Sequence, residues 1–247
     1  MVIIVNVGIT GVGGPAGVVC IKALEDRGLS LVGMDANPLS AGFKLVKKSY
    51  VVPYARDIQF IPKVLEISNR EKIDILIPTV DEELVVLSEN KDKFSAVGTK
   101  VAASGRDSIE NCLDKWVFYK EVKRLDIPTP ETWLPEDVEN VKHLEMPVLV
   151  KPRIGRGGRG VFFCETQEEL NAALKKSENV IIQEYVDGKE YTIDTLSDFE
   201  GNPIVAVCRE RIEIKGGISW KGVIEDVPLL KKVVLKLVKG LGIRGPA

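Results

Sequence analysis

The sequence predicts an α/β domain built on a parallel sheet, followed by an α+β domain built on an antiparallel sheet. Up to about residue 112, short apolar runs alternate with amphipathic segments, which is typical of parallel strands connected by helices. Beyond that point, most apolar runs are separated only by turn residues, which indicates antiparallel strands. The length of 247 residues is also between the typical lengths of a one-domain and a two-domain protein. We therefore expect domains at residues 1–112 and 113–247.

In the first domain, strands are expected at β-branched apolar runs and helices at segments with an apolar residue every three or four positions. Thr79 and Glu82 lie three residues apart just after an apolar strand, which predicts the start of a helix, either with a capping box or, as is more common, without one. The expected strands are residues 2–8, 30–35, 73–78 and 99–103, and the expected helices are residues 15–27, 57–69 and 81–89.

In the second domain, a helix at residues 115–125 ends before Ile127-Pro-Thr-Pro, because each proline biases its predecessor away from the α region. A last helix at 227–241 has an apolar stripe opposite its lysines, and Gly242 ends it. Because such a stripe needs a surface to pack against, we expect the domain to be incomplete at its C-terminal end. The expected strands are residues 147–152, 160–165, 180–186, 190–197 and 203–212, with a helix at 167–176 between them.

Composition excludes several classes of protein. The formal charge, 34 minus 36 or −2, is too balanced for nonspecific phosphate attraction, so no nucleic-acid partner is expected. No apolar run approaches the roughly 20 residues that span a bilayer, and the first residues lack the basic start of a signal peptide. The four cysteines are far apart, which predicts reduced thiols in the core, and His143 is the only histidine. These features predict a cytoplasmic protein without a membrane partner.

A glycine-rich segment, Gly155-Arg156-Gly157-Gly158-Arg159-Gly160, follows an apolar strand. Glycines allow successive backbone N–H groups to converge on phosphate oxygens, and the arginines add positive charge. The segment is not a Walker loop, because a strand follows it rather than a helix. It predicts either a polyphosphate-binding loop or a plain hairpin tip. Lys151 favours the first, since an ammonium at the end of an apolar strand is costly to bury without an anionic partner.

Two carboxylates lie six residues apart around a glycine turn in Gln183-Glu-Tyr-Val-Asp-Gly-Lys-Glu190. Carboxylates accept hydrogen bonds from hydroxyl groups, so Glu184 and Glu190 could hold a ribose, while the backbone of residues 184–186 could contact an adenine edge. The alternative is a pair of solvated glutamates that flank a turn.

Together these segments resemble the ATP-grasp superfamily, most closely its carbamoyl-phosphate-synthase-like ligases, over nearly the whole chain. The resemblance implies a Rossmann-like domain at residues 1–112 and an ATP-grasp domain at 113–247. The smaller ATP-binding lobe would cover residues 113–186, and the larger lobe would begin at 187. The resemblance rests on the order and spacing of Gly8-Ile-Thr-Gly-Val-Gly-Gly, Asp35-Ala-Asn-Pro, Asp114-Lys115, Ile127-Pro-Thr-Pro, Val150-Lys-Pro, the glycine-rich segment, Gln183-Glu-Tyr-Val-Asp-Gly-Lys-Glu, Arg209-Glu-Arg211 and Gly216-Gly217.

The resemblance implies ATP as the cofactor. Lys115 and Lys151 would contact its phosphates, and the loop from Gly155 to Gly160 would fold over the triphosphate. The adenosine contacts that it implies are Glu184 to ribose or adenine, the Val186 backbone N–H to adenine, and Glu190 to ribose.

The resemblance also implies that Arg209 and Arg211 act catalytically near the γ-phosphate and a carboxylate substrate. The residues themselves are equally compatible with an arginine pair that is bonded to Glu210 or Glu213 on a strand surface. The implied reaction forms an acyl phosphate from a carboxylate or bicarbonate, with release of ADP, after which an amine displaces the phosphate.

Mg²⁺ is expected for the family, but the segment that usually carries its ligands does not occur before Ala247. No metal ligand is therefore assigned. The expected partners are a nucleotide, small carboxylate and amine substrates, and either a second copy or a completing chain.

Two alternatives remain. Thr10-Gly-Val-Gly-Gly-Pro-Ala-Gly17 fits the glycine pattern of NAD-dependent short-chain dehydrogenases, Asp35 ends the second strand, and Tyr119 and Lys123 have the catalytic spacing of that class. The other alternative is a truncated module that binds a nucleotide without catalysis.

Overall fold

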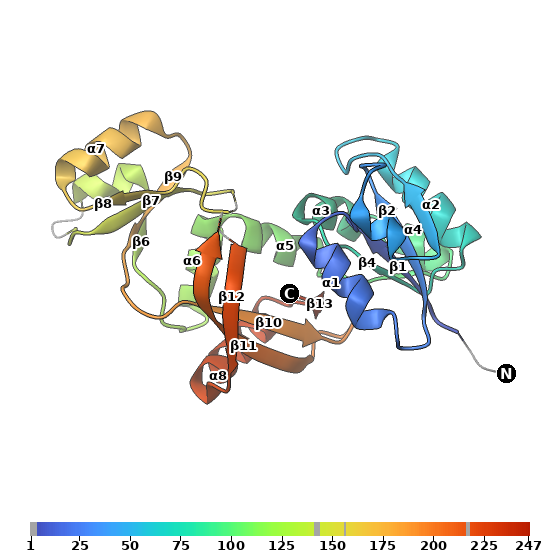
Figure 1. Cartoon of the computed structure of the whole chain (residues 1–247). Coiled ribbons are helices and arrows are strands. Elements are labelled where there is room, and N and C mark those ends of the chain that lie inside the picture. Colours follow the sequence, from blue (N-terminus) through green and yellow to red (C-terminus); the bar gives the residue numbers. More distant parts are fainter. Residues whose placement is uncertain (1–3, 141–143, 156, 216–217) are drawn as a thin grey trace. The chain divides into compact units, whose positions relative to one another are not determined.

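The computed structural model describes residues 4–140, 144–155, 157–215 and 218–247. The chain divides into two compact units (Figure 1). The first extends to Arg106 and includes Arg244–Pro246, and the second contains Asp107–Ile243 and Ala247. The expectations for His143, Arg156 and Gly216-Gly217 lie outside the described residues. Within the described ranges, no helix is long and apolar enough to cross a membrane.

The first unit is a parallel five-stranded sheet in the order β3-β2-β1-β4-β5, covered by helices. This confirms the expected α/β domain. Its strands are β1 (Asn6–Thr10), β2 (Ser30–Asp35), β3 (Lys48–Val51), β4 (Ile75–Ile77) and β5 (Lys100–Val101). Its helices are α1 (Pro15–Leu24), the 3₁₀ helix η1 (Ala41–Lys44), α2 (Phe60–Arg70), α3 (Asp81–Glu89) and α4 (Lys91–Ala96).

Strand β1 lies later in the chain than expected, at Asn6–Thr10 instead of residues 2–8. The sequence suggested that Gly8 ends the strand, but Gly8 is a point of close packing. A Cβ added there would lie 2.8 Å from Ile73 Cδ1. Ile9 beyond it is fully buried. Strand β3 was not expected, because four residues of mixed polarity carry little strand signal.

The helix expected after Thr79 begins at Asp81 as a plain helix start, without the capping box. The N-cap residue of α3 is Val80, without a side-chain cap. The Thr79 hydroxyl instead donates to the carbonyl of Thr10 at 2.7 Å. Glu83, which follows Glu82 in α3, points inward. Its carboxyl group is buried and accepts a hydrogen bond from the Thr10 hydroxyl. Tertiary contacts at the end of β1 therefore replace the local cap.

Glu83→Gln is expected to flatten the pH dependence of stability between pH 4.5 and about 7. Burial raises the pKa of Glu83 from 4.5 to about 7, against the opposing Thr10 hydrogen bond, and Asp35 and Glu82 raise it further. In this window the carboxyl is protonated in the folded chain and ionised in the unfolded chain. The contribution of Glu83 to stability is therefore fully present below pH 4.5 and is lost as the pH rises to about 7. The interval from 4.5 to about 7 corresponds to a loss of about 3 kcal/mol.

Denaturant unfolding of the wild type and of Glu83→Gln, measured below and above this window, checks the expectation. The amide stays neutral and keeps a polar group opposite the Thr10 hydroxyl. An unchanged pH dependence in the variant would contradict the assignment of this effect to Glu83.

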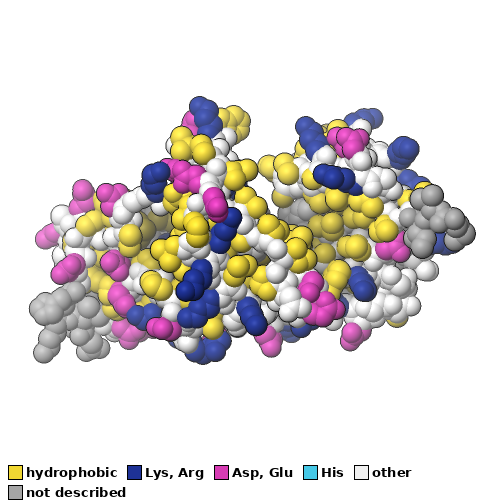
Figure 2. Space-filling model, turned by 90° about the horizontal axis from the view of Figure 1, so that it is seen from below, with side chains coloured by type: hydrophobic (Ala, Val, Ile, Leu, Met, Phe, Trp, Pro, Cys, Tyr) yellow, Lys and Arg dark blue, Asp and Glu magenta, His cyan; other side chains and the backbone are white. Residues whose placement is uncertain are grey.

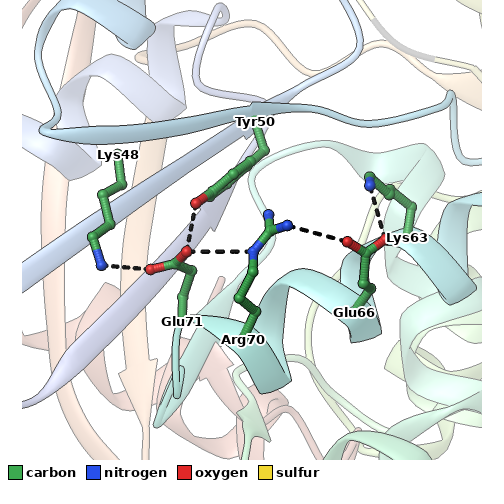
Figure 3. Close-up of polar contacts among 6 residues, drawn as sticks. All are labelled: Lys48, Tyr50, Lys63, Glu66, Arg70 and Glu71. Atoms are coloured by element: carbon green, nitrogen blue, oxygen red, sulfur yellow. Dashed lines mark hydrogen bonds and ion pairs between the residues drawn. The ribbon is translucent and has the colours of Figure 1, made fainter.

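Figure 3 shows a polar cluster between β3 and the end of α2, formed by Lys48, Tyr50, Lys63, Glu66, Arg70 and Glu71. Glu71 accepts hydrogen bonds from Lys48 at 2.6 Å and from Tyr50 at 2.5 Å, which hold its pKa below the usual value. Glu66 pairs with Lys63 at 2.8 Å and Arg70 at 3.2 Å. Both carboxylates are thus paired with cations within the cluster, and the contacts of Glu71 attach the edge strand to the end of α2.

The second unit contains two antiparallel arrangements, which confirms the expected α+β class. One sheet has the order β6-β9-β7-β8, and three long strands run in the order β12-β11-β10. The strands are β6 (Thr132–Trp133), β7 (Val148–Pro152), β8 (Phe162–Cys164), β9 (Val180–Glu184), β10 (Tyr191–Ser197), β11 (Pro203–Lys215) and β12 (Ile218–Glu225). The short strand β13 (Gly245–Pro246) belongs to the first unit. The helices are α5 (Arg106–Leu113), α6 (Lys115–Arg124), the 3₁₀ helix η2 (Pro135–Asn140), α7 (Gln167–Lys176) and α8 (Pro228–Gly240).

Strand β12 was not expected, and β11 continues to Lys215 instead of ending at Ile212. Gly222 in the middle of β12 weakens the strand signal in the sequence. In the structure it allows close approach, because a Cβ there would lie 2.9 Å from the carbonyl oxygen of Glu210. All four cysteines are free, but only Cys164 and Cys208 are buried, and Cys112 is exposed.

The apolar stripe of α8 has its packing partner within this unit. Val234, Leu237 and Val238 form a cluster with Phe118 of α6 and Leu125. The lysines Lys232, Lys236 and Lys239 are exposed. Figure 2, which views the molecule from below, shows a row of Lys and Arg side chains (dark blue) among hydrophobic ones in the region where Figure 1 places α8. The amphipathic pattern in the sequence therefore predicted the faces of this helix correctly.

Candidate functional site

A pocket of about 180 Å³ lies between the start of α6, the end of β7 and the glycine-rich loop. Ligand pockets usually measure about 300–1,000 Å³, so this pocket suits part of a ligand, such as phosphate groups. Six of its lining residues were predicted as site residues. The lining residues are Lys115, Lys151, Pro152, Gly155, Gly157, Gly158, Arg159 and Val161.

The glycines of the loop are required by its backbone conformation. Gly157, Gly158 and Gly160 have φ angles of +67°, +68° and +70°, which L residues rarely adopt. At Gly160 a Cβ would also lie 3.0 Å from Pro152 Cγ. The loop joins β7 to the antiparallel β8, as expected. Backbone N–H groups in such conformations can form a concave site for an anion.

Lys115 is connected to the loop through the start of α6. Its ammonium donates to the carbonyl of Gly155 at 2.9 Å, and its backbone N–H donates to the carbonyl of Arg153, also at 2.9 Å. Asp114 caps the helix by accepting from the N–H groups of Trp116 at 2.9 Å and Val117 at 3.2 Å. The early part of α6 is thereby held beside the loop.

Arg153 pairs with Asp114 at 2.5 Å and so adds a second connection between β7 and α6. Burial raises the pKa of Asp114, but the hydrogen bonds from Arg153, Val117 and Trp116 outweigh it and lower the pKa below the usual value. Sequence reasoning noted Asp114 only as the start of a helix and overlooked Arg153. The helix-capping signal was visible, whereas the arginine partner depends on the fold.

Lys151 lies half-buried at the end of β7, and its ammonium donates to Gln183 Oε1 at 2.5 Å. Burial, followed by repulsion from Lys115, lowers the pKa of Lys151. Burial also lowers the pKa of Lys115, with Asp114 opposing the change. An anion in the pocket would stabilise both ammonium groups, which otherwise repel each other.

The residues predicted to contact adenosine do not line this pocket. Glu184 ends β9 and is tied to Glu131. Its N–H donates to the Glu131 carbonyl at 2.8 Å, and its carboxylate accepts from the Glu131 N–H at 3.0 Å. Val186, two residues on, has a side chain that is 61% exposed. Glu190 forms an ion pair with Arg211, whose backbone N–H donates to the Glu190 carbonyl at 2.8 Å.

Arg209 and Arg211 alternate with Glu210 on β11 and therefore share one face of the strand. Arg209 contacts the two carboxylate oxygens of Asp194 at 3.2 and 3.3 Å. Both arginines therefore form ion pairs, as the alternative expected, but with Asp194 and Glu190 where Glu210 or Glu213 had been named. The antiparallel pairing of β10 with β11 determines the partner of Arg209, because it places Asp194 within reach of the arginine.

Three acidic residues on and beside the long strands are occupied by other side chains. Asp194 pairs with Arg209, Glu225 accepts from Tyr191 at 2.7 Å, and Asp226 pairs with Lys231 at 2.6 Å. Among the residues that the structure describes, no three His, Cys, Asp or Glu side chains come together as metal ligands. These residues do not fit a Mg²⁺ site, and no chemical step is assigned to a metal.

The residues of the dehydrogenase alternative have structural partners. The Tyr119 hydroxyl and the Lys123 ammonium both contact the Glu131 carboxylate, at 2.7 and 2.6 Å. The Asp35 carboxylate accepts from the N–H groups of Gly13 at 2.7 Å and Asn37 at 2.8 Å, so it stabilises the turn between β1 and α1. The glycine pattern at residues 10–17 is explained by packing and turn geometry.

Comparisons with known proteins agree with this geometry. Residues 112–245 match the family described as "ATP-grasp domain", and residues 8–102 match "PylC-like, N-terminal domain". The carbamoyl phosphate synthase large chain of Clostridium botulinum (strain Kyoto / Type A2) is 30% identical over 253 residues, which cover 93% of this chain and 23% of that protein. The comparisons give no support to the dehydrogenase alternative.

Solved structures show the same fold. The L-amino acid ligase from Bacillus licheniformis has a TM-score of 0.70 at 20% identity, covering 98% of this chain and 61% of that chain. The biotin carboxylase domain of Hydrogenobacter thermophilus 2-oxoglutarate carboxylase, in complex with MgADP, ADP and bicarbonate, has a TM-score of 0.68 at 20% identity, covering 98% and 59%. The chain thus spans about a fifth to a quarter of the length of the curated relatives and about 60% of these structures.

Proposed function

Since the chain belongs to the ATP-grasp family, we propose that it binds ATP and forms the nucleotide-binding part of a ligase that joins a carboxylate to an amine. The observation that carries the proposal is the pocket in which Lys115 and Lys151 converge beside the glycine-rich loop. Two half-buried ammonium groups with depressed pKa values, beside a loop of left-handed glycines, complement the negative charge of a polyphosphate. The smaller ATP-binding lobe is assigned to residues 113–186, and the larger lobe begins at 187.

In this proposal each group has a defined part in phosphoryl transfer. The two lysines, Arg159 and the loop N–H groups of Gly155, Gly157, Gly158 and Gly160 bind the phosphates. Arg209 and Arg211 balance charge on the γ-phosphate and orient the carboxylate. A carboxylate oxygen attacks the γ-phosphorus as the bond to ADP breaks, and an amine then displaces phosphate from the acyl phosphate. Such catalysis relies on positioning and charge neutralisation.

Glu184, the Val186 N–H and Glu190 are proposed to contact adenosine. They lie at the end of β9 and before β10, immediately after Gln183, whose amide contacts Lys151. The side chain of Glu190 is 55% exposed, which leaves it accessible to a ribose. ATP-grasp proteins generally use Mg²⁺ with ATP. Its ligands are not assigned to residues of this chain.

Thermal unfolding with ATP, ADP or NAD, each with and without Mg²⁺, tests the nucleotide assignment. Binding to the folded state raises the melting temperature. ATP and ADP are expected to raise it and NAD to leave it unchanged. ATP and ADP have a free terminal phosphate that can enter the cationic pocket, whereas the diphosphate of NAD is esterified at both ends, and the residues of the dehydrogenase alternative have other partners. A larger shift with NAD than with ATP would contradict the proposal.

ADP release in the presence of candidate carboxylates and amines tests the catalytic part. Release that depends on both substrates supports a ligase. Tight ATP binding without ADP release for any substrate pair would instead favour a nucleotide-binding module without catalysis.

Exposed apolar side chains on the long strands favour a partner chain. Ile204, Trp220 and Ile224 are 64%, 64% and 73% exposed, and β12 is an edge strand. Exposed apolar surfaces and strand edges commonly mark interfaces. We propose that a second copy or a completing polypeptide covers this surface. Light scattering distinguishes the two, because only the first yields a dimer of the isolated protein.

A further inference from the structure

The ammonium of Lys151 is held by a neutral amide. Its hydrogen-bond acceptor is Gln183 Oε1, at 2.5 Å. A glutamate at position 183 would have nearly the same shape but would form an ion pair. The amide satisfies one of the three N–H donors of the ammonium without removing its charge.

The orientation of the Gln183 amide is determined by a chain of hydrogen bonds that all run in one direction. The Thr132 hydroxyl donates to the carbonyl of Pro130 at 3.1 Å, which can only accept. Thr132 Oγ1 therefore accepts from Gln183 Nε2, at 2.8 Å. Since Lys151 can only donate, Oε1 must face it. Thr132 is 2% exposed, so water does not compete for these bonds.

The sheet holds these three side chains rigidly. Thr132 is paired with Gln183 across β6 and β9, and β7, which carries Lys151, is the other neighbour of β9. The adjacent residues Val150 and Ile182 are fully buried on the opposite face, in the core beneath α7. Because successive residues of a strand point to opposite faces, Lys151 and Gln183 share the face away from that core.

We propose that Gln183 is a positioning residue, which orients the Lys151 ammonium at the glycine-rich loop and leaves its positive charge available to a bound anion. The anion is the ATP phosphate, so the inference rests on the proposed function. The other charged side chains at the pocket are Lys115 from α6 and Arg159 from the loop, both cationic. The nearby carboxylate of Glu184 is bonded to the Glu131 N–H. None of the described lining residues has a carboxylate that could neutralise these cations in place of the ligand.

Two substitutions separate orientation from charge. Gln183→Glu keeps an acceptor for Lys151 but compensates its charge, so the pKa of Lys151 is expected to rise and ATP affinity to fall at least tenfold. Gln183→Leu removes the acceptor, so the pKa is expected to fall further, and ATP affinity falls as well because the ammonium loses its orientation. Gln167→Leu on α7 is the matched control, because the Gln167 amide donates to Asn171 and does not line the pocket. It is expected to leave the pKa of Lys151 and the ATP affinity unchanged.

The pKa of Lys151 is measured on the ligand-free protein by NMR of ¹³C-labelled lysines, and the signal is assigned by its loss in Lys151→Arg. ATP affinity is measured by calorimetry. The two measurements test separate claims. If the wild type does not bind ATP, the proposed function is refuted, but the titration of Lys151 in the ligand-free protein still tests its contact with Gln183. An unchanged Lys151 titration in Gln183→Glu, or wild-type ATP affinity in both Gln183 variants, would overturn the positioning role.

Thr132→Val provides a test if the Gln183 variants do not fold. It removes only the group that orients the amide and leaves Gln183 and Lys151 in place. A folded Thr132→Val protein is expected to bind ATP more weakly than the wild type. Affinity equal to the wild type would overturn the inference, because the amide orientation would then have no effect on Lys151.

Discussion

Lys151→Ala is expected to weaken ATP binding by about 10- to 100-fold. A hydrogen bond that involves a charged group contributes about 1.5–3 kcal/mol, and each 1.4 kcal/mol is about tenfold in affinity. Lys151 is half-buried and its charge is not compensated by a carboxylate, so a phosphate gains more from it than from a lysine exposed to solvent. Lys115 and the loop remain in the variant, which is why binding is weakened and not abolished.

Calorimetric titration of ATP into the folded variant measures this loss. Tyr119→Phe is the control, because the Tyr119 hydroxyl contacts Glu131 and does not line the pocket. Its affinity is expected to equal that of the wild type. Normal binding by Lys151→Ala together with weak binding by Tyr119→Phe would refute the assignment of the phosphate site.

Gly17→Ala is expected to destabilise the first unit by about 3 kcal/mol or more. Gly17 lies in α1 against the turn that follows β1. A Cβ there would lie 2.4 Å from the carbonyl oxygen of Gly11 and 2.7 Å from Val12 Cα. Both atoms belong to the backbone, so rotation of a side chain cannot relieve the contact, and the helix must move away from the sheet.

Gly14→Ala is the matched control in the same glycine pattern. Gly14 has a φ of −84°, and a Cβ there would meet nothing closer than the Gly11 carbonyl oxygen at 3.5 Å. We expect a loss of no more than about 1 kcal/mol. Denaturant unfolding measures both variants. Equal losses at the two positions would mean that close packing is not the reason for the glycine at position 17.

The elements with a strong local pattern were predicted from sequence. Helices α6, α7 and α8 have caps or apolar stripes that a short window reveals, and they lie within a few residues of the expected ranges. Strands β3 and β12 were overlooked because one is short and of mixed polarity and the other contains Gly222. Their pairing with neighbouring strands stabilises them, and pairing is not a property of a local window.

At the site, the residues that line the phosphate pocket were predicted, whereas their partners were not. Lys151 was expected to need an anion, yet its protein partner is the amide of Gln183, 32 positions away. Arg209 was expected either to act in catalysis or to pair with Glu210 or Glu213, and its partner is Asp194. The register between strands decides these contacts.

Apolar periodicity, turn residues and glycine placement depend on neighbours in the chain. The amino-acid order therefore determined by itself the parallel and antiparallel sheets, the loop at Gly155 to Gly160 and the lysines beside it. Only the tertiary structure decided which polar atoms meet: the hydroxyl of Thr10 with Glu83, and the amide of Gln183 with Lys151. The physical reason is that a hydrogen bond requires a few tenths of an ångström in placement, which only the packed sheet supplies.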